Sequence, residues 1–157
     1  MANAAQEAAL KVLSAKIDQP GDATDWFEIT QDRINQFAEA TMDHQWIHVD
    51  PERAKAGPFG APIAHGQLTL SILSFLPGDA DIGVPALDGV KLGINYGWNR
   101  VRFPSPVPVG AHLRTRGCIK SVEAKGDMLE VVNELTCEIK GSDKPACVGE
   151  SVLRLVF

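Results

Sequence analysis

The sequence has little positive charge. It contains 15 Lys and Arg residues against 20 Asp and Glu residues, which gives a formal net charge of −5 at pH 7. Non-specific binding of nucleic acids depends on Lys and Arg side chains that neutralise phosphates. We therefore expect no nucleic-acid partner.

Long hydrophobic runs and cysteines are also scarce. The most apolar stretch, residues 68–76, is far shorter than the roughly 18 residues that a membrane-spanning helix needs. The N-terminal residues lack the basic region and apolar core of a secretory signal. The 3 cysteines are odd in number, and their spacing fits no zinc-binding pattern. We expect a protein with no membrane partner, located in the reducing cytoplasm.

The chain of 157 residues has the length of one domain, and its first half contains two helical patterns. Residues 31–41 place apolar side chains at helical spacing after Thr30, a residue type that caps helices. Residues 42–62 are rich in proline and glycine and predict an irregular but packed segment. Residues 67–76 are apolar on nearly every side, which predicts one buried helix that Pro77 and Gly78 end.

The second half of the chain has the pattern of an antiparallel sheet. In residues 128–140, apolar residues alternate with charged ones, which is the period of a half-buried strand. Lys125-Gly126-Asp127 before it predicts a hairpin turn. Helices followed by a run of strands indicate an α+β fold. The strands are expected at residues 90–103, 111–123, 128–140 and 147–156.

Asp43 and His48 are the first candidates for catalysis. A carboxylate and an imidazole on one short irregular segment can act together as acid and base on one small molecule. An Asp and a His this close in sequence more often form a solvated loop pair, but the apolar residues around them raise the odds of a buried site. His44 and His48 also have the spacing of helical zinc ligands, but no Glu follows His44, and the segment is not helical in pattern. We expect no metal.

His65 and Gly66 stand at the start of the apolar helix. The first N–H groups of a helix have no partner within it, and a glycine there lets a ligand oxygen approach closely. Gly66 therefore indicates either an oxyanion site or merely a tight turn into the helix. The residues by themselves leave both interpretations open.

Three stretches, residues 37–43, 48–50 and 59–66, together resemble the MaoC-like hydratases. The family's core motif is an Asp, four residues, a His, and then an apolar Ala-His-Gly at the head of the central helix. The segment 101–110, with its Arg-Phe and Pro-Val-Gly, resembles a later segment of the family. Gln45-Trp46 replaces the Asn-Pro of many members, which places the chain closest to the nodulation-protein-N-like branch.

The resemblance implies a fold and a set of site residues. The fold would be a single hot-dog domain over residues 1–157, with an antiparallel sheet wrapped around one central apolar helix and residues 1–24 as an N-terminal extension. Asp43 and His48 would be the catalytic pair. The residues that would bind substrate or its oxyanion are His65, Gly66 and Ser71.

The resemblance also implies an activity. The protein would reversibly hydrate trans-2-enoyl thioesters to (R)-3-hydroxyacyl thioesters, with water activated by the pair. It would need no metal or redox cofactor, because coenzyme A or acyl carrier protein belongs to the substrate. Family members pair their sheets, so we expect a homodimer. Asn99 and Arg100 are candidates to support the pair or, for Arg100, to hold a phosphate, although both also fit solvated strand residues.

Two other functions fit the same fold. A hot-dog thioesterase would hydrolyse the thioester, but its carboxylate belongs on or near the central helix, and residues 67–76 contain neither Asp nor Glu. A non-catalytic module that binds acyl thioesters or a signal molecule would have no need of Asp43 and His48 together.

Overall fold

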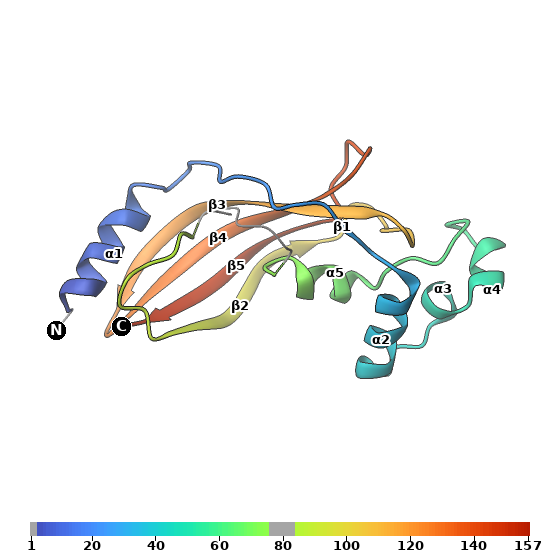
Figure 1. Cartoon of the computed structure of the whole chain (residues 1–157), viewed down its shortest axis with the longest axis horizontal. Coiled ribbons are helices and arrows are strands. Elements are labelled where there is room, and N and C mark those ends of the chain that lie inside the picture. The colour runs from blue at the N-terminus through green and yellow to red at the C-terminus, as the bar shows by residue number, and fades with distance from the viewer. Residues whose placement is uncertain (1–2, 76–83) are drawn as a thin grey trace.

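A curled antiparallel sheet of five strands forms the body of the molecule (Figure 1). The computed structural model describes residues 3–75 and 84–157. The strand order is β1-β3-β4-β5-β2, and every neighbouring pair is antiparallel. The strands predicted from the sequence are confirmed to within a few residues. They are β1 (Phe27–Glu28), β2 (Leu92–Arg102), β3 (His112–Lys125), β4 (Met128–Ile139) and β5 (Cys147–Val156).

The alternation of residue types decides which face of the sheet is buried. On β4, Leu129, Val131 and Leu135 are at most 1% exposed, as period two requires for one apolar face. The hairpin between β3 and β4 turns at Gly126, whose φ of 67° favours glycine. The predicted hairpin turn is therefore confirmed.

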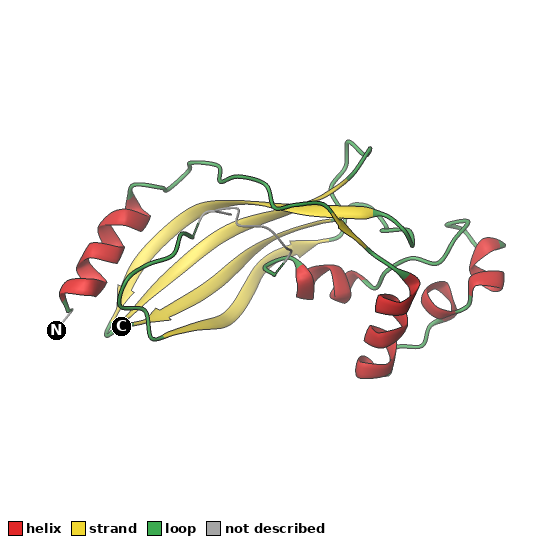
Figure 2. Ribbon diagram, viewed as in Figure 1, coloured by secondary structure: helices red, strands yellow, loops and turns green. Residues whose placement is uncertain are grey.

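The helices gather at the two ends of the sheet and beneath its concave face (Figure 2). α2 begins after Thr30, whose side chain accepts a hydrogen bond from the Arg33 N–H, so the predicted cap is confirmed. α1 lies at the end of the sheet near the C-terminus, and α2, α3 and α4 lie at the other end. The bounds are α1 (Ala4–Ser14), α2 (Gln31–Thr41), α3 (Trp46–Val49), α4 (Pro51–Lys55) and α5 (Gly66–Ile72).

The expectation of irregular structure throughout residues 42–62 is wrong in part, because α3 and α4 form there. Pro51 occupies the first position of α4, where its missing N–H costs no hydrogen bond. The Asp50 side chain caps this helix by accepting from the Arg53 N–H. A proline that suggests a chain break thus starts a short helix.

α5 is the predicted apolar helix, but it is shorter and less enclosed than expected. It ends at Ile72 rather than residue 76, and Pro77-Gly78 lie outside the described residues. Leu68 and Thr69 are buried, whereas the Phe75 side chain is 77% exposed. The reason is geometric: α5 lies against one side of the sheet, which covers one side of the helix (Figure 1).

Two apolar clusters fill the space beneath the sheet. The first surrounds α5 and includes Leu68, Leu113 and Leu135. The second cluster lies where α1 packs on the sheet and includes Leu13 and Leu129. α1 belongs to the expected N-terminal extension. No helix among residues 3–75 and 84–157 is long and apolar enough to cross a membrane.

Candidate functional site

The backbone of residues 47–48 is tied to the strand-like segment that leads into α5. The Ile63 N–H donates to the Ile47 carbonyl over 3.0 Å. His48 Nδ1 lies 2.7 Å from the Ile63 carbonyl. The Gln31 side chain on α2 donates from Nε2 to the His48 carbonyl over 2.8 Å. These contacts fix His48 between α2 and the start of α5.

The Ile63 carbonyl also fixes the tautomer of His48. A carbonyl oxygen can only accept, so Nδ1 carries the proton and Nε2 keeps its lone pair. The side chain is 6% exposed. Burial is the largest influence on this group and lowers the pKa of His48 below its usual 6.5, against the opposing effects of the Ile63 carbonyl and Asp43. His48 is therefore held as a neutral base.

Asp43 follows a sharp turn of the chain after α2. The helix ends at Thr41, and Met42 after it has a φ of 62°, in the left-handed region. The Asp43 side chain is exposed, and its Oδ1 accepts from the Gln45 N–H over 3.3 Å. Single side-chain atoms of Asp43, His48 and His65 all lie within 4.8 Å of one another. One water can bridge atoms at that separation with two ordinary hydrogen bonds.

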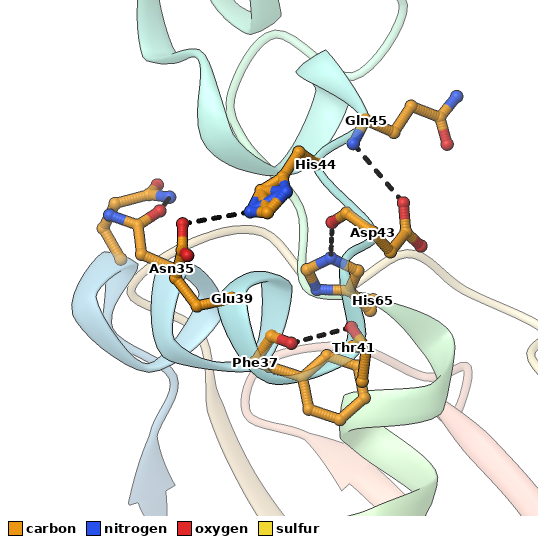
Figure 3. A network of polar contacts seen from close by, with 9 residues as sticks. Asn35, Phe37, Glu39, Thr41, Asp43, His44, Gln45 and His65 are labelled. Carbon is orange, nitrogen blue, oxygen red and sulfur yellow. Dashed lines mark hydrogen bonds and ion pairs between the residues drawn. The ribbon is translucent and has the colours of Figure 1, made fainter.

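His65 lies next to the backbone of Asp43 (Figure 3). Its Nε2 is 2.9 Å from the Asp43 carbonyl, and its ring stacks on His48 with centroids 3.8 Å apart and planes at 26°. The Phe37 ring packs on it from α2 at 5.0 Å. His65 is 2% exposed, and its Nδ1 has no hydrogen-bond partner among the described residues. The structure thus brings three of the predicted site residues, Asp43, His48 and His65, close together.

A cavity of about 370 Å³ opens beside His48 and Gly66. The N–H of Gly66 has no acceptor within the described part of the chain. A Cβ on Gly66 would lie 3.2 Å from the ring of Phe103, which is a tight contact that the ring would have to yield to. The remaining walls are mostly apolar: Phe59, Ile63, Ala64, Thr69, Ser105, Pro106, Val107 and Ala146.

Asp43, His48 and His65 are also residue types that bind metals. Their arrangement does not favour one shared ion, because the two imidazoles stack at 26° and their in-plane lone pairs do not converge on one point. His65 Nε2 is moreover engaged by the Asp43 carbonyl. The expectation of no metal stays a prediction.

Three predicted site residues lie apart from the cavity. The exposed Ser71 hydroxyl donates to the Gln67 carbonyl on its own helix. Arg100 has a side chain that is 84% exposed and lies 3.6 Å from Glu150. Asn99 beside it is exposed on β2. Among the described residues, none of the three contacts Asp43 or His48, and their roles stay predictions.

The sequence reasoning missed the residues that shape the cavity. Phe59 and Phe103 come from segments far apart in the sequence, and neither carries a group that suggests chemistry. Gln31, which donates to the His48 carbonyl, lies within the predicted helix 31–41, and the sequence analysis gave it no role in the site. One feature of the sequence could have indicated the cavity wall. Segment 103–108 is apolar and rich in proline, and it packs against the cavity instead of serving only as a connection.

Comparison with known proteins gives consistent matches. Residues 12–138 match the MaoC-like domain family. The protein named 3-hydroxyacyl-thioester dehydratase Z from Mycobacterium tuberculosis is 50% identical over 145 residues, which cover 92% of this chain and 93% of that protein. Nodulation protein N from Rhizobium leguminosarum is 39% identical over 153 residues, 96% of this chain and 93% of its own.

Solved structures match in fold. A MaoC-like dehydratase from Rhodospirillum rubrum superposes with a TM-score of 0.69 at 17% identity, over 89% of this chain and 92% of that one. An (R)-hydratase from A. caviae superposes with a TM-score of 0.62 at 23% identity, over 86% of this chain and 95% of that one. The predicted α+β hot-dog fold is confirmed.

The first prediction concerns proton binding by His48. Burial disfavours the imidazolium, so the midpoint of its titration should lie below 6.5 in the folded protein and return to about 6.5 in urea. Because the unfolded chain then binds the proton more readily, the free energy of unfolding should fall as pH drops below 6.5. Nitrogen-15 NMR of the His48 ring measures the midpoint, and a folded value at or above 6.5 contradicts the burial argument.

Proposed function

Because the chain belongs to the MaoC-like domain family and is a hydro-lyase, we propose that it reversibly hydrates trans-2-enoyl thioesters to (R)-3-hydroxyacyl thioesters. The observation that carries this proposal is the juxtaposition of Asp43 and a neutral, buried His48. The relative at 50% identity is named a 3-hydroxyacyl-thioester dehydratase, and the solved (R)-hydratase has the same fold.

The proposed reaction places one water between the two catalytic side chains. His48 Nε2, which bears the free lone pair, accepts a proton as the water oxygen attacks C3 of the enoyl group. The Asp43 carboxylate orients this water. The pair then delivers the proton to C2, so one hydroxyl group and one proton are added across the double bond. Dehydration is the same path in reverse.

The Gly66 N–H supplies the third element of the proposal. As water adds, negative charge develops on the thioester oxygen, and a backbone N–H aimed at that oxygen stabilises it. Gly66 lines the same cavity as His48, and its N–H meets no acceptor among the described residues. The surrounding apolar walls exclude water and strengthen this interaction.

The reaction needs no resident cofactor, because addition of water involves no net transfer of electrons. We propose that coenzyme A or acyl carrier protein enters only as the carrier portion of the substrate. A cytoplasmic location is part of the proposal. It is supported by three free thiols, of which Cys137 is buried with a pKa raised by burial to about 12.

Substitution of either catalytic side chain tests the assignment. Asp43→Asn and His48→Ala should each lower turnover by at least about 100-fold, the scale of lost acid–base catalysis. The measurement is the loss of enone absorbance of crotonyl-CoA, with chiral analysis of the product. His112→Gln, which changes an imidazole on β3, is the matched control and should keep full activity.

A folded variant with near-normal turnover would remove Asp43 or His48 from the mechanism. Release of free thiol by the wild type, measured with a thiol reagent, would instead support a thioesterase. Binding without turnover of short, long and branched enoyl thioesters would support a binding module.

Gly66→Ala tests the helix start. The new Cβ would lie 3.2 Å from the Phe103 ring, which is 42% exposed and can move outward. Stability should therefore hold or rise, since alanine favours helices over glycine by up to about 1 kcal/mol. We expect kcat/KM to fall about tenfold, less than the ~100-fold that a 1 Å displacement can cost. The experiment combines thermal unfolding with kinetics, and unchanged kinetics would speak against the role of Gly66.

We further propose that two copies pair through β2. This strand forms one edge of the sheet, and no described strand lies on its outer side. Leu92, Ile94 and Tyr96 on it are 55%, 37% and 58% exposed. The other edge strand, β1, has only 2 residues. A long apolar edge is a hazard for a monomer, and pairing with a second copy covers it.

Light scattering tests this interface. Wild-type protein should elute as a dimer at micromolar concentration, and Ile94→Arg should shift it toward monomer, because an unpaired charge is costly in a buried contact. Val12→Arg is the matched control, since Val12 is 45% exposed on α1, which packs against β3 and β4. A monomeric wild type, or a dimer that tolerates Ile94→Arg, contradicts the proposed pairing.

A further inference from the structure

We propose that His65 is a positioning residue, which holds Asp43 and His48 in one fixed arrangement relative to the start of α5. This role differs from the substrate contact expected from the sequence. His65 is 2% exposed, its ring packs against those of Phe37 and His48, and it is not part of the cavity lining, so a substrate in the cavity does not reach it. The inference rests on the proposed function, because positioning has meaning only if the pair is catalytic.

The first contact through which His65 acts is a hydrogen bond to the backbone of Asp43. A carbonyl cannot donate, so His65 Nε2 carries the proton and donates it to the Asp43 carbonyl over 2.9 Å (Figure 3). Asp43 follows the left-handed turn at Met42 and is exposed. Within residues 3–75 and 84–157, His65 is the only partner of that carbonyl. This bond therefore ties the catalytic carboxylate to the segment that begins α5.

The second contact is the ring stack. The bond from His48 Nδ1 to Ile63 fixes one ring atom but leaves the imidazole free to swing about that bond. The His65 ring stacks on the face of the His48 ring, with centroids 3.8 Å apart, and prevents this rotation. The Phe37 ring also packs against His65, with centroids 5.0 Å apart. His48 Nε2 is therefore aimed by two constraints, and His65 supplies one of them.

The remaining nitrogen of His65 separates this role from acid–base catalysis. Nδ1 is buried and has no hydrogen-bond partner among the described residues. With Nε2–H engaged by Asp43, His65 presents no proton to the cavity, whose lining includes His48 but not His65. Both imidazoles thus have one nitrogen held by a backbone carbonyl, but only His48 lines the cavity.

Three substitutions separate the two contacts. His65→Phe keeps a flat ring and loses the donor, His65→Gln keeps a donor and loses the ring, and His65→Ala loses both. We expect His65→Ala to lower kcat about 100-fold with KM little changed, because misplaced groups weaken the transition state alone. His65→Phe and His65→Gln should each recover part of this loss. His112→Phe is the matched control and should leave kcat unchanged.

The wild-type protein provides a test that does not depend on how the variants fold. Nitrogen-15 NMR should show His65 as the Nε2–H tautomer and His48 as the Nδ1–H tautomer. The opposite tautomer at His65 would overturn the proposal, as would a folded His65→Ala variant with normal kcat. A rise in KM at constant kcat would assign His65 to substrate binding instead. Absence of hydration by the wild type would refute the proposed function and leave the tautomers as an independent result.

Discussion

The hydrogen bond between His48 and the Ile63 carbonyl sets the geometry on which the rest of the site depends. It joins the segment after α2 to the segment before α5, and it leaves His48 Nε2 free. The Ile63 N–H reinforces this junction by donating to the Ile47 carbonyl. His48 belongs to α3, which has only 4 residues, and Ile63 lies outside the helices and strands of the described residues, so regular structure gives the junction little support. The pair of bonds supplies the order that regular structure would otherwise provide.

The cavity extends this order to parts of the chain that are distant in sequence. Gly66 at the start of α5 meets Phe103 just after β2, and a Cβ on Gly66 would lie only 3.2 Å from the Phe103 ring. The Ala64 N–H donates to the Val107 carbonyl, which holds the proline-rich segment against the same helix start. His48, the Gly66 N–H and the apolar wall of the cavity are therefore joined by direct contacts. A change in the position of one of them is expected to shift the others.

Burial gives these contacts their chemical effect. His48 stays in its neutral, proton-accepting form at lower pH than a solvated imidazole does, because burial disfavours its charged form and lowers its pKa. The same surroundings strengthen any hydrogen bond to charge that develops in the cavity. Asp43, by contrast, remains exposed to solvent, where water is available. A buried base beside an exposed carboxylate suits a reaction whose second substrate is water.

The sequence by itself determined the strands, the capped helix after Thr30 and the candidate residues Asp43, His48, His65 and Gly66, because periodicity and short motifs are local properties. It could not determine the true extent of α5 or the helix at Pro51, since partial cover by the sheet and a side-chain cap decide these. Only the tertiary structure revealed the tautomers of the two imidazoles, the fit of Phe103 against Gly66 and the solvent-exposed positions of Ser71 and Arg100. Each of these depends on which distant atoms meet, and no local pattern contains that information.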